Sequence, residues 1–198
     1  MERPERYEIR FGGSGGQGII TAARILAEAI SEHGGKYVCQ SQSYGPEARG
    51  GASKADIVFS DEPIDYPKAT KPDLLLAMNQ TACDTYFSDL KPDGLLVVDS
   101  GLVDQVPTRR AVGIPFTDLA RKETGKELVA NMVALGALTH LINAVSPKNV
   151  EKTLMAKVPK GTEELNRKAF RAGYKAAKDV NVSALTGKEA RAYDDELV

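Results

Sequence analysis

YEIRFGGSGGQGIITAARILAEAI, residues 7–30, is the stretch that decides the fold class. Residues 7–11 alternate between polar and apolar side chains, a pattern typical of a β-strand. A glycine-rich segment follows at 12–18, and apolar residues then recur at helical spacing as far as residue 30. A strand, a glycine turn and a helix in this order predict the first unit of a Rossmann-like α/β fold.

The alternation of strands and helices continues along the chain. Short apolar runs predict buried strands, and residues 80–90 suit a short helix between two of them. The expected strands after the first are 37–40, 55–59, 74–78, 95–98 and an edge strand at 111–114. Such an order indicates a mostly parallel sheet covered by helices on both faces.

The C-terminal part of the sequence is expected to be helical. Residues 128–142 are apolar on nearly every side, which is typical of a buried helix. Ser146 and Pro147 are a good N-cap and first helical residue for the next helix, and residues 162–178 form an amphipathic one. The fold class is therefore α/β: a Rossmann-like three-layer domain with a mostly parallel sheet and a helical C-terminal part.

Length and charge limit the classes of protein to consider. The chain has 198 residues, which suits one domain, expected over residues 1–182 with a polar tail at 183–198. Its net charge of −1 argues against a nucleic-acid partner, which would require a basic excess. No apolar run is long enough to cross a membrane, and the first residues lack the apolar stretch of a secretory signal. A cytoplasmic protein is expected.

Resident metal chemistry is not expected in this chain. Its two cysteines, Cys39 and Cys83, are too few for an iron–sulfur cluster, which takes four thiolates. Two histidines without a Cys-x-x-Cys pair leave no zinc site. We therefore predict neither metal ligands nor a set of catalytic residues.

The glycine segment is a candidate binding site for a cofactor or substrate. Gly13, Gly15 and Gly18 satisfy the spacing G-x-G-x-x-G at the start of a helix, where free N–H groups and the helix dipole favour an anion such as a pyrophosphate. The candidate residues are Gly13, Ser14, Gly15, Gly16, Gln17 and Gly18. No acidic residue for a ribose stands at 38–43, which disfavours NAD(P). Phosphate binding and simple close packing both remain open.

A second glycine-rich motif spans residues 43–51. Its candidate residues, for an interface or a contact near coenzyme A, are Tyr44, Gly45, Pro46, Glu47, Arg49, Gly50 and Gly51. The planar fork of Arg49 suits a carboxylate or a phosphate, on a substrate, on coenzyme A or across a subunit interface. Alternatively, Glu47 and Arg49 pair with backbone groups and only shape the loop. A structural role is favoured over direct chemistry.

Read together, these segments resemble one family. Residues 13–27 and the string Ser-Tyr-Gly-Pro-Glu-Ala-Arg-Gly-Gly at 43–51 are similar to the gamma subunits of 2-oxoacid:ferredoxin oxidoreductases, as are residues 131–138 and 166–174. The resemblance covers nearly the whole chain, and the second motif is its most specific part.

The resemblance implies a subunit that is inactive alone. Such enzymes decarboxylate a 2-oxoacid oxidatively on thiamine diphosphate with Mg, reduce ferredoxin through iron–sulfur clusters and release an acyl-CoA. The expected partners are the alpha-, beta- and delta-type subunits that carry these cofactors, with coenzyme A entering near the gamma chain. Among substrates, 2-oxoglutarate is favoured over branched-chain 2-oxoacids and pyruvate.

The glycine motif also fits functions other than that of a gamma subunit. The G-x-G-x-x-G spacing also suits a free-standing NAD(P) or flavin reductase, or a nucleotide- or CoA-binding Rossmann-like module without a redox partner. Self-association of the isolated chain into a homodimer is also left open.

Overall fold

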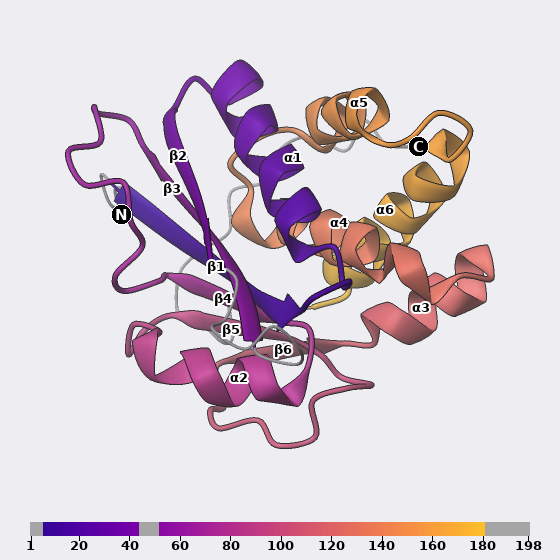
Figure 1. The fold of residues 1–198 in the computed structure, drawn as a ribbon, viewed down its shortest axis with the longest axis horizontal. Coiled ribbons are helices and arrows are strands. Elements are labelled where there is room, and N and C mark those ends of the chain that lie inside the picture. The colour runs from indigo at the N-terminus through magenta and orange to yellow at the C-terminus, as the bar shows by residue number, and fades with distance from the viewer. Residues whose placement is uncertain (1–5, 44–51, 181–198) are drawn as a thin grey trace.

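The computed structural model describes residues 6–43 and 52–180 (Figure 1). Six strands form one sheet: β1 (Arg6–Ser14), β2 (Tyr37–Ser43), β3 (Ala52–Ser60), β4 (Leu74–Ala77), β5 (Leu95–Asp99) and β6 (Ala111–Ile114). The α-helices are α1 (Ile19–His33), α2 (Gln80–Tyr86), α3 (Phe116–Thr124), α4 (Ala130–Ile142), α5 (Pro147–Lys157) and α6 (Glu163–Lys178), with 3₁₀ turns at Phe87–Asp89 (η1) and Glu127–Val129 (η2). The expected polar tail lies outside the described residues.

The order of strands in the sheet is β2-β3-β1-β4-β5-β6. β1, β4, β5 and β6 are parallel neighbours, which confirms the mostly parallel sheet. β3 runs antiparallel to both β1 and β2. After β1 the chain therefore goes to the edge strand β2 and comes back as β3, which lies between β2 and β1. It then crosses β1 and adds β4, β5 and β6 outward on the other side.

Helices cover the sheet unequally. The larger core lies on the face that carries Ile9 and Phe11 of β1, where α1, α3, α4, α5 and α6 contribute buried side chains. α2 covers the opposite face with a smaller core that includes Leu75 and Leu96. All residues of α4 from Ala130 to Thr139 are buried, as its apolar sequence predicts.

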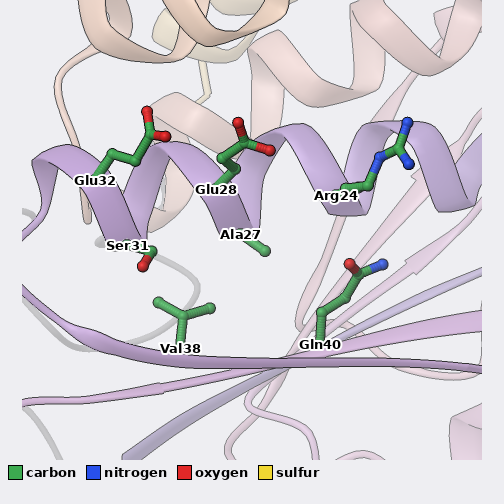
Figure 2. Close-up of a pocket in the computed structure, with 7 residues that line it drawn as sticks. All are labelled: Arg24, Ala27, Glu28, Ser31, Glu32, Val38 and Gln40. Carbon is green, nitrogen blue, oxygen red and sulfur yellow. The ribbon is translucent and has the colours of Figure 1, made fainter. Parts of the chain in front are cut away.

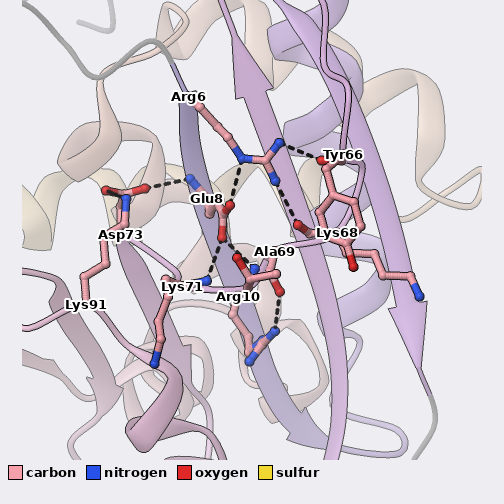
Figure 3. A network of polar contacts seen from close by, with 10 residues as sticks. Arg6, Glu8, Arg10, Tyr66, Lys68, Ala69, Lys71, Asp73 and Lys91 are labelled. Carbon is pink, nitrogen blue, oxygen red and sulfur yellow. Dashed lines mark hydrogen bonds and ion pairs between the residues drawn. The ribbon is translucent and has the colours of Figure 1, made fainter.

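The connection from β3 to β4 crosses the α2 face of β1 without a helix. Charged side chains of β1 hold it, as Figure 3 shows. Glu8 accepts hydrogen bonds from the backbone N–H groups of Thr70 and Lys71 at 2.7 and 2.9 Å. Arg6 donates to the carbonyl oxygens of Tyr66 and Lys68 at 2.6 and 2.8 Å. Side-chain hydrogen bonds thus replace apolar packing in this crossover.

Helix boundaries follow the capping residues of the sequence. The Ser146 hydroxyl accepts the N–H of Asn149 at 3.3 Å and Pro147 opens α5, as predicted. α1 ends at His33, and its C-cap residue Gly34 donates its N–H to the Ile30 carbonyl at 2.8 Å. The helix expected at 80–90 is divided, because α2 passes into η1 after Tyr86. In the described part of the chain, no helix is both long and apolar enough for a membrane span.

The two cysteines differ in accessibility, which gives a chemical test of the fold. Cys83 lies on the buried face of α2, and burial raises the pKa of its thiol. Cys39 is half-buried on the edge strand β2. Because the thiolate is the reactive form, we expect N-ethylmaleimide to label Cys39 first and Cys83 only after unfolding. Peptide mass spectrometry of the native and denatured chain measures this, and labelling of native Cys83 at an equal rate would contradict the described packing.

Candidate functional site

The first half of the glycine motif belongs to a strand. β1 continues through Gly13 and Ser14, which pair with Ser53 and Ala52 of β3. The sequence pattern predicts the end of this strand at residue 11, because the β3 partners that extend it lie 38 and 40 residues further along the chain. Only residues 15–18 form the turn into α1.

The motif glycines fall into two groups. An added Cβ at Gly13 would lie 2.9 Å from both Gln17 Oε1 and Ile19 Cγ2, and one at Gly18 would collide with the Asn131 amide. Gly18 also has φ of 68° as the N-cap of α1. At Gly15 and Gly16, by contrast, an added Cβ would meet nothing within 4 Å. Gly13 and Gly18 are therefore required for packing, and the middle of the loop faces open space.

An amide cluster fixes the shape of this loop. Gln17 Oε1 accepts hydrogen bonds from the Ser14 N–H at 2.7 Å and from Asn79 Nδ2 at 2.8 Å. Gln17 Nε2 donates to the Met78 carbonyl at 3.1 Å, and Asn79 Nδ2 also donates to Ser14 Oγ at 2.7 Å. The side chain of Gln17, one of the candidate binding residues, is thus bonded inside the chain.

Two further polar residues hold neighbouring elements to the loop. Asn131 of α4 donates to the Gly18 carbonyl at 3.0 Å, which is the buried hydrogen bond between layers that its place in an apolar helix predicts. Asp99, fully buried at the end of β5, accepts the Gly101 N–H at 3.1 Å and both the N–H and the hydroxyl of Thr117 at 3.0 and 2.6 Å. Asp99 is therefore a cap and not a ligand contact.

A hollow of about 310 Å³ opens beside the glycine loop. It lies at the carboxyl ends of β1, β4 and β5, where open parallel sheets bind ligands. Its lining residues are Gly16, Gln17, Met78, Leu102, Thr117, Glu127, Leu128 and Ala130. Gly16 and Gln17 are binding residues predicted from the sequence. The other lining residues, from Met78 to Ala130, belong to segments without a recognisable binding motif.

A second hollow, of about 300 Å³, lies between α1 and β2 (Figure 2). Its walls are largely polar and charged, with Arg24, Glu28 and Glu32 on the helix and Val38 and Gln40 on the strand. It contains no residue of the glycine loop. We therefore take the hollow beside that loop as the candidate site.

The candidate residues Tyr44, Gly45, Pro46, Glu47, Arg49, Gly50 and Gly51 lie outside the described residues. The described flanks of this motif are informative, because Ser43 pairs with Lys54 and Ala52 pairs with Ser14. Both ends of the segment therefore start from the same edge of the sheet as the glycine loop. The roles of Glu47 and Arg49 stay predictions.

Metal-binding groups are not gathered at this site. Across residues 6–43 and 52–180, no cluster of three or more His, Cys, Asp or Glu could hold a metal ion. The candidate site instead offers backbone N–H groups at the start of α1, where the first turn of a helix leaves its donors free, and an apolar hollow beside them.

Residues 8–176 match the family described as pyruvate ferredoxin/flavodoxin oxidoreductase. The chain belongs to this family. Subunit KorC of the 2-oxoglutarate synthase of Methanocaldococcus jannaschii is 51% identical over 179 residues, which are 88% of this chain and 96% of that subunit.

Solved structures agree with the family. The gamma subunit of a keto/oxoacid ferredoxin oxidoreductase from Geobacter sulfurreducens is 48% identical with a TM-score of 0.80, covering 87% of this chain and 97% of that one. A 2-oxoglutarate:ferredoxin oxidoreductase from Magnetococcus marinus, solved with 2-oxoglutarate, coenzyme A and succinyl-CoA bound, has a TM-score of 0.79 at 27% identity. The match covers 90% of our chain but only 32% of the Magnetococcus marinus chain. Our chain thus corresponds to a gamma subunit of this oxidoreductase family.

Proposed function

We propose that this chain is the gamma subunit of a 2-oxoglutarate:ferredoxin oxidoreductase and that its glycine loop contacts coenzyme A. The observation that carries the proposal is the open middle of the loop at the carboxyl edge of the sheet, next to an apolar hollow. The choice of 2-oxoglutarate is supported by the relative at 51% identity, a subunit of 2-oxoglutarate synthase.

A division of labour between subunits supports the same proposal. With two cysteines, this chain has too few thiolates to hold an iron–sulfur cluster, so electron transfer requires another subunit. We infer that alpha-, beta- and delta-type subunits carry thiamine diphosphate, Mg and the clusters, and pass electrons to ferredoxin. The gamma chain then completes the site where the acyl group meets coenzyme A.

The loop chemistry suits the phosphates of coenzyme A. The N-terminus of α1 combines free N–H donors with the positive end of the helix dipole, and both favour an anion. Gly15 and Gly16 leave room for a ligand to approach the backbone closely. The apolar walls of the hollow, Met78 and Leu102 among them, suit the uncharged arm of the same molecule.

The proposal is tested by reconstitution. The chain is co-expressed with the subunits encoded beside it, and reduction of ferredoxin or of a viologen dye is measured with 2-oxoglutarate, pyruvate and a branched-chain 2-oxoacid. We expect CoA-dependent activity that is highest with 2-oxoglutarate and absent from the isolated chain. Activity of the isolated chain with NAD(P) or flavin would instead support the free-standing reductase.

The glycine loop has its own test, Gly15→Val. Because an added Cβ at Gly15 meets nothing within 4 Å, the variant is expected to fold with a melting temperature close to that of the natural chain. If coenzyme A approaches the loop backbone, the added side chain should raise KM for coenzyme A about tenfold, equivalent to about 1.4 kcal/mol of lost contact. Ser88→Val, at an exposed residue of η1, is the control. An unchanged KM would leave the glycines with a packing role alone.

A further inference from the structure

β2 forms one edge of the sheet and leaves that edge open to a further strand. Its 7 residues, Tyr37–Ser43, pair with β3 in an unbroken register and have no neighbouring strand on the other side among the described residues. Proteins usually protect such an edge with charged residues, proline or a bulge, and β2 has none of these. Lys36, which precedes β2, is paired with Asp61. The opposite edge strand, β6, has only 4 residues and is followed directly by Pro115.

The hydrogen bonds of β1 decide which neighbour each residue of the first three strands faces. The Glu8 carbonyl accepts the Asp73 N–H at 2.8 Å, on the β4 side. The Gly12 carbonyl accepts the Met78 N–H at 2.9 Å on the same side. Because backbone groups of successive residues point to opposite sides of a strand, the odd-numbered residues of β1 bond to β3. Odd-numbered residues of the two strands oppose each other, so the even-numbered residues of β3 face β2.

The same alternation identifies the free backbone groups of β2. Cys39 is opposite Val58 in the register, so the odd-numbered residues of β2 bond to β3. The N–H and carbonyl groups of Val38, Gln40 and Gln42 therefore point to the open edge, where no described residue bonds to them. This row of groups is symmetric about Gln40, so an antiparallel copy of the same strand can pair with all of it.

The helix that lies along this edge has an order of charges that suits a second copy. α1 lies over β2, with Arg24 above Gln40 and Glu32 above Val38 (Figure 2). Both charged side chains are exposed, and no ion pair ties Arg24 to another described residue. A twofold axis through β2 sets the two α1 helices antiparallel, so that Arg24 of each copy lies toward Glu32 of the other. Any strand could bond the edge, but this charge order favours a copy of the same chain.

We propose that two copies of this chain associate through β2, with antiparallel strands and a twofold axis at Gln40. Val38 of each copy then pairs with Gln42 of the other, and the two Gln40 residues pair with each other. Each of these pairs exchanges two hydrogen bonds, so the outward groups are satisfied and the two sheets become one. The inference does not rest on the proposed function, because the hollow beside the glycine loop contains no residue of β2.

Gln40→Pro tests the pairing of the strands. The Gln40 N–H points outward, so proline removes no hydrogen bond to β3, and an edge strand tolerates proline at such a position. We expect the natural chain to sediment as a dimer and the variant to have a dimer dissociation constant about tenfold higher or more, with an unchanged circular dichroism spectrum. Gln40→Lys, which sets two like charges at the axis, should act in the same direction. Ser88→Lys, at an exposed residue of η1, is the matched control.

Ser41→Cys tests the register. Cys39 of one copy and Ser41 of the other form a non-hydrogen-bonded pair, in which Cα atoms lie about 4.5 Å apart, within the range of a disulfide. Mild oxidation should therefore join two variant chains through Cys39 and the introduced thiol, as mass spectrometry of the linked peptides would show. Ser88→Cys, whose thiol lies away from the edge, should not be cross-linked. A bond between the two Cys39 residues instead would overturn the axis at Gln40.

A charge exchange on α1 tests the choice of occupant. Arg24→Glu should weaken the dimer, and the double variant Arg24→Glu, Glu32→Arg should restore it, because the reversed order of charges is again complementary. A double variant that stayed dissociated would show that α1 does not face its own copy. A natural chain that is monomeric at micromolar concentration would overturn the inference, as would a dimer that Gln40→Pro leaves intact. None of these results bears on the contact between the glycine loop and coenzyme A.

Discussion

Gly136→Ala is expected to destabilise the chain by about 3 kcal/mol or more, at the upper end of the range for overpacked cores. Gly136 of α4 faces α6, where an added Cβ would lie 2.8 Å from the Tyr174 nitrogen and would overlap the Phe170 carbonyl. Both obstacles are backbone atoms, so neither can rotate away. The gain of about 1 kcal/mol in helix propensity from Gly to Ala is too small to offset the separation of two helices.

Gly173→Ala tests the same contact from the other helix. An added Cβ there would lie 2.6 Å from the Val133 carbonyl carbon, so a loss of similar size is expected. Urea denaturation of the purified chains measures both variants. Gly15→Ala is the matched control, because its Cβ meets nothing within 4 Å. If Gly136→Ala were more stable than the natural chain, the gain in helix propensity would exceed any cost of the added Cβ. The close contact between α4 and α6 would then be wrong.

The second large effect is expected from Arg10→Met, with a loss of about 3–5 kcal/mol, the usual cost of removing one partner of a buried ion pair. Arg10 lies buried on β1 and donates to both carboxylate oxygens of Asp56 on β3, at 2.8 and 3.1 Å. It also donates to the Ala69 carbonyl at 3.0 Å and pairs with Asp89. Burial by itself lowers the pKa of Arg10, but the hydrogen bond and charge of Asp56 outweigh it and raise that pKa. Methionine would leave Asp56 buried without its cation.

The double variant Arg10→Met, Asp56→Leu separates the cost of an orphaned charge from the value of the ion pair. Replacing a buried pair by apolar side chains is often nearly neutral, so the double variant should recover most of the lost stability. Asp89, which is partly exposed, can be hydrated in both variants. Chemical denaturation of the natural chain, the two single variants Arg10→Met and Asp56→Leu, and the double variant completes the double-mutant cycle. If the double variant were as unstable as Arg10→Met, the loss would come from packing around Tyr86, whose ring lies 5.6 Å from the guanidinium.

Local patterns predicted most elements of the fold because the physics of those elements is local. The helix after the glycine motif, the buried α4 and the capped start of α5 follow from side-chain periodicity and from Ser146 and Pro147. The glycine motif lies where a strand passes into a helix, as predicted, although Gly13 and Ser14 still belong to β1. Its spacing could not show that Gly13 and Gly18 pack while Gly15 and Gly16 stay open. Gly18 meets Asn131, over a hundred residues away, and Gly13 meets Gln17, Ile19 and Met78.

The direction of β3 also depends on distant partners. A run of buried residues looks the same in parallel and antiparallel strands, so residues 55–59 predict a strand without its direction. The hollow was equally hidden. Leu102 lies in a turn without a binding motif, and Leu128 opens the apolar run 128–142 that predicts a buried helix, whereas the structure places it in η2 with 77% of its surface exposed. Their convergence with Gly16 becomes apparent only once α3, α4 and the sheet are packed together.

The sequence by itself determined the α/β class, the position of the glycine loop at the start of α1, and a cysteine content too small for an iron–sulfur cluster. It did so because periodicity, capping and ligand count are properties of neighbouring residues or of composition. Tertiary structure alone decided the antiparallel direction of β3, the pairing of Arg10 with Asp56 and the hollow beside the glycine loop. These features arise from contacts between residues far apart in the chain, and such contacts form only when the strands pair and the helices pack against both faces of the sheet.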